Sequence, residues 1–126
     1  MPKGKFFVLE GMDGSGKATQ TKLLVEALKN KGFKILERNF SNKFGEIDII
    51  AQDRAILVFV EVKTKKGTDF GLPEEMINAY KLQRIRKMAE VYMNGKNLPC
   101  RIDVVAILLS ETNELLNLNH YESVYL

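Results

Sequence analysis

Apolar and polar positions alternate with two different periods along the chain, and together they predict an α/β fold. A short apolar run at residues 5–10 predicts a buried strand that leads into a glycine-rich loop. Apolar residues then recur at helical spacing over residues 16–31. Lys29 and Lys31 suit the negative end of that helix, and Gly32 provides its stop. From Phe33 the period changes to that of strands.

The rest of the chain predicts three strands, a helix and one more strand. Strands are expected at residues 34–40, 45–52 and 55–64, and the polar turns between them suit an antiparallel meander. Pro73 at a first-turn position marks a second helix that ends near Asn94 and Gly95. Residues 101–110 are rich in Val, Ile and Leu, which predicts a buried, parallel strand. The pattern of residues 115–126 is ambiguous.

The length of 126 residues favours one domain over two, because two independent units would each have too small a core. The chain is 45% hydrophobic and 28% charged, within the range of soluble globular proteins. It contains neither an internal repeat nor a Pro/Ser-rich linker. We therefore expect residues 1–126 to form a single α/β domain.

Cysteine content and hydropathy favour a cytoplasmic protein with no membrane partner. Cys100 is alone and cannot form an internal disulfide, and we expect it to be a small buried residue beside the strand that follows. No apolar run approaches the length of a membrane span.

The net charge of +3 comes with two local basic clusters in the second part of the chain. They can contact the phosphates of a nucleic acid or form an ordinary solvated face. Tyr80 and Tyr92 are interpreted as helix packing rather than as base-stacking platforms, and His120 carries no metal signal. The clusters consist of Lys63, Lys65 and Lys66, and of Lys81, Arg84, Arg86 and Lys87.

A phosphate-binding loop is predicted between the first strand and the first helix, because two glycines four residues apart precede a lysine there. Backbone N–H groups of such a loop surround a phosphate, and the lysine meets its outer charge. The alternative is that the segment only supplies a strand and a helix to the core. The candidate phosphate-binding residues are Gly11, Asp13, Gly14, Ser15, Gly16, Lys17, Ala18 and Thr19.

Residues 7–11 and 13–20 resemble the opening of thymidylate kinase, and the resemblance covers residues 4–32. Ala18 stands where many such loops place a Mg²⁺-binding hydroxyl, and the hydroxyl moves to Thr19. The monophosphate-binding motif and the arginine-rich lid of such a kinase do not follow. Without them phosphoryl transfer lacks its positioning groups, so we expect phosphate or ATP binding at most and no kinase activity.

A second constellation joins two carboxylates and a lysine on neighbouring predicted strands. Because side chains alternate along a strand, Glu61 and Lys63 share one face, and Asp48 lies on the strand beside them. An Asp–Glu pair suits Mg²⁺ or Mn²⁺, and a neighbouring lysine can orient or activate an attacking water. The alternative is a salt-bridged pair at a strand end.

Residues 35–39, 44–51, 58–64, 70–75 and 101–105 resemble the YraN-like family of predicted endonucleases, and the resemblance covers residues 33–110. It implies a restriction-endonuclease-like core, related to Holliday-junction resolvases, with the order helix, three strands, helix, strand. It also implies that Asp48 and Glu61 bind the metal, that Lys63 is the catalytic lysine and that Glu46 is a supporting acid. The family's first helix carries an acid near this site, where this chain has Thr21.

The two resemblances meet at Gly32 and Phe33 without a linker, which we interpret as an engineered chimera of residues 1–32 and 33–126. The expected fold is a restriction-endonuclease-like αβββαβ core with an additional N-terminal strand and phosphate loop. One functional hypothesis is weak Mg²⁺-dependent hydrolysis of nucleic acid, because the helix acid is missing. The other is an inactive protein that binds phosphate or nucleotide at residues 11–19. We expect the protein to be either a monomer or a dimer that pairs through the exposed edge of the added strand.

Overall fold

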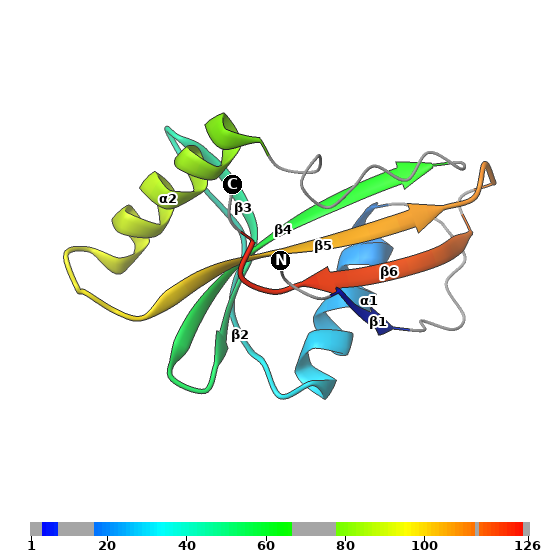
Figure 1. Cartoon of the computed structure of the whole chain (residues 1–126), viewed down its shortest axis with the longest axis horizontal. Coiled ribbons are helices and arrows are strands. Elements are labelled where there is room, and N and C mark those ends of the chain that lie inside the picture. Colours follow the sequence, from blue (N-terminus) through cyan, green and yellow to red (C-terminus); the bar gives the residue numbers. More distant parts are fainter. Residues whose placement is uncertain (1–3, 8–16, 67–77, 113, 125–126) are drawn as a thin grey trace.

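One twisted sheet with helices on both faces forms the framework of the protein (Figure 1). The computed structural model describes residues 4–7, 17–66, 78–112 and 114–124. Within these residues the sheet has six strands in the order β1-β6-β5-β4-β3-β2. The elements are β1 (Gly4–Phe7), α1 (Lys17–Asn30), β2 (Lys34–Asn42), β3 (Gly45–Asp53), β4 (Ile56–Lys66), α2 (Ala79–Met93), β5 (Cys100–Leu109) and β6 (Leu115–Tyr121).

The sequence α1-β2-β3-β4-α2-β5 has the predicted order of helix, three strands, helix and strand. Strands β2, β3 and β4 form the expected antiparallel meander, and Arg54 takes a left-handed conformation (φ 58°) in the second turn. Strand β5 pairs parallel with β4, as its continuous apolar sequence predicted. The mixed α/β arrangement is consistent with a nuclease-like fold.

The first and last strands of the described residues pair with each other at one edge of the sheet. Residues 115–121, which the sequence left ambiguous, form β6 antiparallel to β5. Strand β1 pairs with β6, also antiparallel, in a register that places Gly4 opposite Tyr121. The helix α1 starts at Lys17 and stops before Gly32, whose φ of +97° suits a residue without Cβ.

Helix α2 begins at Ala79, later than the first turn at Pro73 that the sequence predicted. Residue 73 lies outside the described residues, but Asn78 is extended (φ −94°, ψ 172°) and caps a helix that starts at Ala79. Its side-chain oxygen accepts a hydrogen bond from the Lys81 backbone N–H at 2.8 Å. The predicted end is confirmed, because Asn94 closes the helix in a left-handed conformation.

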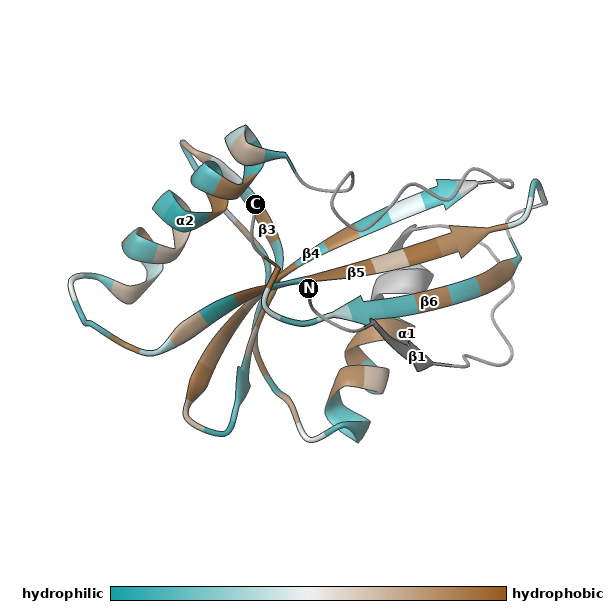
Figure 2. Ribbon diagram, viewed as in Figure 1, coloured by the Kyte–Doolittle hydropathy of each residue, from teal (hydrophilic) through white to brown (hydrophobic). Residues whose placement is uncertain are grey.

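The two sides of strand β4 face different helices. Val58 and Val60 belong to the apolar cluster that includes Leu24 and Leu28 of α1. On the opposite side, Phe59 packs with apolar residues of α2. Figure 2 shows hydrophobic residues concentrated in the central strands, where they overlap in this view, and hydrophilic ones on the outer surface of α2. The alternation along β4 therefore places Glu61 and Lys63 on the side of the sheet that carries α2.

Cys100 is exposed rather than buried as predicted. It is the first residue of β5 and follows residues 94–99, which are all exposed, so neither helix covers its side chain.

No helix of the described residues is long and apolar enough to cross a membrane.

Candidate active site

Asp48 and Glu61 lie next to each other where the pairing of β3 with β4 ends. The last paired residues are Ile49 and Val60, and the two acids are the next residues along each strand. Beyond that point the Asp48 carboxylate replaces the missing backbone partner, since its Oδ2 accepts a hydrogen bond from the Val62 N–H at 2.8 Å. The structure thus brings together the two carboxylates that the sequence proposed as metal ligands.

Glu61 is buried and forms an ion pair with Lys81 from the first turn of α2. Only 6% of Glu61 is exposed, and its Oε1 lies 2.5 Å from Lys81 Nζ. Burial raises the pKa of Glu61; the hydrogen bond from Lys81 opposes that rise, and the nearby Asp48 charge adds to it. The net shift is upward, so one lysine does not fully compensate the burial of this carboxylate.

Lys63 is the third predicted member of the site and is strongly influenced by Lys81. The contact with the Lys81 side chain lowers the pKa of Lys63, and burial and the Lys81 charge add to this effect. The pKa of Lys81 itself is raised, because its hydrogen bond and charge interaction with Glu61 outweigh the effect of burial. Two lysines and two carboxylates therefore share this site, with the proton held more tightly on Lys81 than on Lys63.

The sequence analysis gave Lys81 no catalytic role, although it named the residue in a basic cluster. Its part in the site depends on where α2 begins, since the Asn78 cap places Lys81 in the first turn, above β4. The available signal was the position of this lysine. It lies near the start of the helix that follows the predicted catalytic strand, where it can reach that strand's carboxylates.

The other predicted site residues are not assembled with this cluster. Glu46 is exposed, and the charges that act most strongly on Glu61 belong to Lys81, Asp48 and Lys63. Among the described residues, no group of three or more His, Cys, Asp or Glu side chains is arranged to hold a metal ion. Within the part of the chain that the structure describes, the acids that meet at this site are Asp48 and Glu61.

The predicted phosphate loop lies largely outside the described residues. Gly11, Asp13, Gly14, Ser15 and Gly16 fall in the range 8–16, and the backbone of Lys17, Ala18 and Thr19 forms the start of α1. The helix α1, which starts at Lys17, agrees with the helix predicted over residues 16–31.

A second charged cluster, made by Asp103, His120 and Arg101, is closed to solvent. Asp103 and His120 are both 0% exposed, and His120 Nε2 lies 2.7 Å from Asp103 Oδ2. Arg101 Nε donates to Asp103 Oδ1 at 3.0 Å, and the Ser123 backbone N–H donates to the same oxygen at 3.0 Å. Burial alone would raise the pKa of Asp103, but these hydrogen bonds outweigh it and hold the pKa below its usual value.

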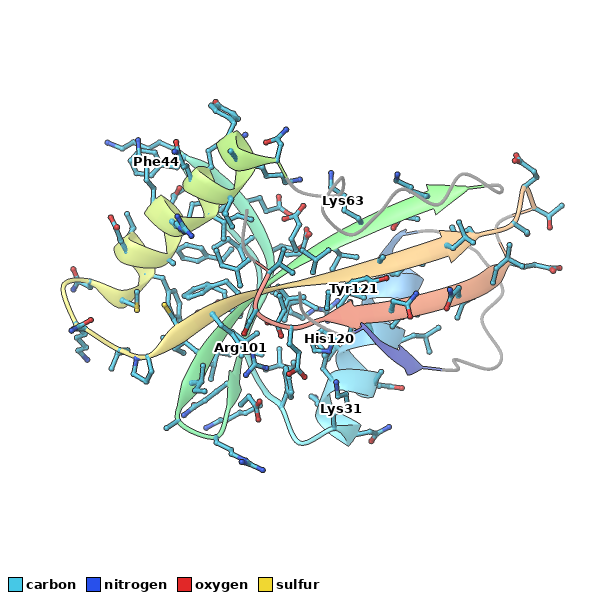
Figure 3. All side chains as sticks on the ribbon, viewed as in Figure 1. Lys31, Phe44, Lys63, Arg101, His120 and Tyr121 are labelled. Carbon is cyan, nitrogen blue, oxygen red and sulfur yellow. The ribbon has the colours of Figure 1, made fainter. Side chains whose placement is uncertain are left out.

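This cluster joins parts of the molecule that are far apart in sequence. Lys31, just beyond α1, lies 3.1 Å from His120 Nδ1 through its Nζ, and Arg101 also reaches Asp53 of β3 at 3.1 Å. Figure 3 shows Lys31, Arg101 and His120 gathered on one side of the molecule, away from Lys63. Because its central members are inaccessible, the cluster holds α1, β3, β5 and β6 together and offers no surface for catalysis.

The two tyrosines of α2 differ in a way that the sequence did not predict. Tyr92 packs edge-on against Phe40 and Phe59, with ring centroids 5.4 Å and 6.1 Å away, which confirms its packing role. Tyr80 is 70% exposed, so its interpretation as helix packing was wrong. It lies in the first turn of α2, where its ring is beside the Arg84 guanidinium.

Comparison with known proteins identifies the chain's family. The model of the "Uncharacterised protein family UPF0102" matches residues 22–107. A UPF0102 protein of Dictyoglomus turgidum is 45% identical over 104 residues, which cover 80% of this chain and 88% of the relative. Another, from Persephonella marina, is 42% identical over 106 residues, covering 82% and 86% of the two chains. The chain therefore belongs to family UPF0102, the YraN-like family that its strand motifs resemble.

Proposed function

We propose that this protein is a metal-dependent nuclease with a restriction-endonuclease-like core, and that it hydrolyses phosphodiester bonds of nucleic acid. The observation that carries the proposal is the pairing of Asp48 with Glu61 at one end of a strand ladder, beside Lys63. Membership of the YraN-like family supports it, because the strand motifs of this chain resemble that group of predicted endonucleases.

The donor set suits Mg²⁺ or Mn²⁺. Both ions prefer carboxylate oxygens, and Asp48 and Glu61 provide two such groups side by side. Burial raises the pKa of Glu61 and the neighbouring Asp48 charge adds to that rise, so a cation bound between the two carboxylates would offset their mutual repulsion. A metal bound by these two acids would polarise a phosphodiester and stabilise the charge that develops on it.

Lys63 is proposed to orient or activate the attacking water. Its lowered pKa makes loss of a proton easier than for an ordinary lysine, which is the property required of a general base. Lys81 is proposed to position Glu61, since it pairs with that carboxylate directly, and it also keeps the proton away from Lys63.

The activity is proposed to be weak. The YraN-like pattern has a helix acid where this chain has Thr21, so the site lacks one carboxylate that the resemblance implies, and a metal is held less tightly with one carboxylate fewer. The remaining coordination would come from water and substrate, which lowers affinity for the metal.

Cleavage assays with matched variants test the proposal. Parent protein is incubated with single-stranded, duplex and branched DNA in Mg²⁺ or Mn²⁺, alongside Glu61→Gln and Lys63→Ala. The control is Glu90→Gln, which removes an exposed acid from α2 away from the site. We expect metal-dependent cleavage that both site variants lose, by roughly 100-fold or more, and that the control retains. Equal cleavage by parent and Glu61→Gln, or none by folded parent, would reject the proposal.

A second candidate is phosphate or nucleotide binding at residues 11–19, favoured by the start of α1 at Lys17 directly after the glycine-rich sequence. Calorimetric titration with ATP tests it. We expect Lys17→Ala to lose binding and Lys22→Ala, an exposed lysine further along the same helix, to keep it. Unchanged affinity in Lys17→Ala would leave the segment as scaffold only.

The comparisons do not support a chimera with its joint at Gly32 and Phe33. The match to the family model begins at residue 22, inside the segment that resembles thymidylate kinase. The kinase-like origin of residues 4–32, and the status of β1 as an addition to the core, remain proposals from the sequence resemblance.

A further inference from the structure

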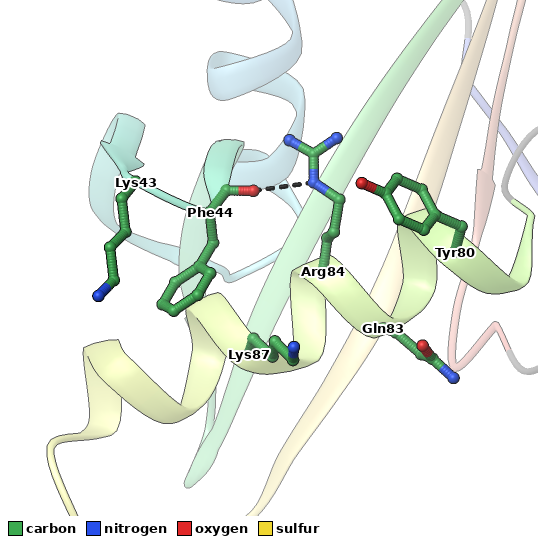
Figure 4. Close-up of a pocket in the computed structure, with 6 residues that line it drawn as sticks. All are labelled: Lys43, Phe44, Tyr80, Gln83, Arg84 and Lys87. Atoms are coloured by element: carbon green, nitrogen blue, oxygen red, sulfur yellow. Dashed lines mark hydrogen bonds between the residues drawn. The ribbon is translucent and has the colours of Figure 1, made fainter.

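A cleft on the outer side of α2 combines cationic and aromatic side chains (Figure 4). One wall is the turn between β2 and β3, and the other is the exposed face of the first three turns of the helix. Its lining residues are Lys43, Phe44, Tyr80, Gln83, Arg84 and Lys87. None of these six is acidic, so the cleft as a whole attracts anions.

The cleft is held in shape by contacts between the turn and the helix. Arg84 Nε donates a hydrogen bond to the Phe44 carbonyl oxygen at 2.8 Å, and Asn42 Oδ1 accepts one from the Phe44 N–H at 2.8 Å. Gly45 permits this approach, because a Cβ at that position would lie 2.3 Å from Arg84 Nη2, and its φ of +143° disfavours other residues. The two walls are therefore fixed relative to each other.

Cations and rings are interleaved in the cleft. Lys43 Nζ and Lys87 Nζ lie 5.2 Å and 5.9 Å from the centre of the Phe44 ring, and Arg84 Cζ lies 5.7 Å from that of Tyr80. Tyr80 is nevertheless 70% exposed. A large ring that remains exposed beside an arginine has a free surface for a planar partner.

The cleft adjoins the candidate active site through α2. Tyr80 precedes Lys81, the residue that pairs with Glu61, and Arg84 lies one helical turn beyond Tyr80. From Tyr80 to Lys87 the helix rises roughly 10 Å, enough for a few nucleotides of one strand. A strand bound in the cleft would thus lead toward the two carboxylates.

We infer that this cleft binds the unpaired nucleotides of a single-stranded segment, with Tyr80 stacking on a base and Lys43, Arg84 and Lys87 contacting phosphates. The inference deepens the proposed nuclease function and rests on it for the substrate class. Single strands are favoured over duplex because their bases are free to stack on an aromatic ring, whereas paired bases are already stacked between neighbours.

Binding measured without metal tests the inference separately from cleavage. Fluorescence anisotropy of a labelled oligo-dT and of a duplex of equal length is recorded in EDTA with the full chain and its variants. We expect tighter binding of the single strand, about tenfold weaker binding for Tyr80→Leu, and near-parent binding for Tyr80→Phe, which keeps the ring. Circular dichroism confirms that each variant is folded.

A matched pair of charge variants separates the cleft from the rest of the helix surface. Lys87→Ala should lower the slope of log affinity against log salt by about 0.7, the value for one phosphate contact on a single strand. Arg86→Ala removes an equally exposed cation of α2 that does not line the cleft, and should leave the slope unchanged.

Three results would overturn the inference: equal binding by Tyr80→Leu and parent, tighter binding of duplex than of single strand, or equal losses for Arg86→Ala and Lys87→Ala. Competition by polyglutamate as strong as that by oligo-dT would indicate an acidic protein partner and also reject it.

Cleavage that is insensitive to Tyr80→Leu refutes only the cleft. Binding as expected without any cleavage refutes only the nuclease.

Discussion

Glu61 and Asp103 are buried carboxylates on neighbouring central strands, yet their surroundings have opposite effects. Asp103 is 0% exposed and receives hydrogen bonds from His120, Arg101 and the Ser123 backbone, which hold its pKa below the usual value. Glu61 is 6% exposed and pairs with Lys81, but burial and the Asp48 charge raise its pKa.

The difference separates a structural carboxylate from a candidate catalytic one. A buried charge that is fully hydrogen-bonded can be retained for its contribution to the fold. A buried carboxylate beside a second acid, whose pKa stays raised although two lysines lie nearby, is an arrangement that stability alone does not favour. Burial therefore does not distinguish a structural carboxylate from a catalytic one. The number of hydrogen bonds that the carboxylate receives and the signs of the neighbouring charges do.

Removing the Asp103 carboxylate should have the largest effect on stability. We expect Asp103→Ala to lower the free energy of unfolding by about 3–5 kcal/mol, because it leaves Arg101 and His120 without their buried partner. Urea unfolding measures the change. Asp53→Ala removes a more exposed partner of the same Arg101 and should cost less than about 1 kcal/mol. Equal losses in the two variants would contradict the comparison.

Replacement of His120 should have an intermediate effect. His120→Leu keeps apolar contact with Phe33 but removes the hydrogen bond to Asp103, so we expect a loss of about 1–3 kcal/mol in urea unfolding. Unchanged stability would show that the network is not needed for the fold.

Removal of Lys81 should alter the candidate site more than the stability of the protein. Lys81→Met should change the free energy of unfolding by less than about 1 kcal/mol, because the lysine side chain is 34% exposed. The pKa of Glu61 should rise further and that of Lys63 should rise toward its usual value, since Lys81 lowers both. NMR titration of the two side chains measures the shifts; unmoved values would show that Lys81 does not control them.

The pH dependence of stability should have opposite signs at the two carboxylates. Because the pKa of folded Glu61 is raised above its usual 4.5, its contribution is present below that pH and is lost as pH rises through the folded pKa. For Asp103 the pKa is lowered, so its contribution is present above the usual 3.8 and is lost as pH falls through the folded pKa.

Unfolding free energies between about pH 3 and pH 7 test these signs. Glu61→Gln should remove the decrease on raising the pH and leave the acid-side loss in place. A decrease that persists unchanged in Glu61→Gln would assign it to another group.

Much of the fold and part of the site were accessible from the sequence because they depend on local periods. Alternation along residues 55–64 placed Glu61 and Lys63 on one side of β4, and the continuous apolar run at residues 101–110 predicted a parallel strand. The start of α2 was misplaced because the Asn78 cap gives a weaker signal than Pro73.

By itself, the sequence determined the order of the central elements, the faces of the strands and the chemical types at Asp48, Glu61 and Lys63, because these follow from side-chain spacing along a regular backbone. Only the tertiary structure decided which charges meet. It placed Lys81 on Glu61, enclosed Asp103 with His120 from a strand 17 residues away, and left Tyr80 exposed beside Arg84. Burial and pairing arise from contacts between distant segments, and those contacts exist only once the helices pack on the sheet.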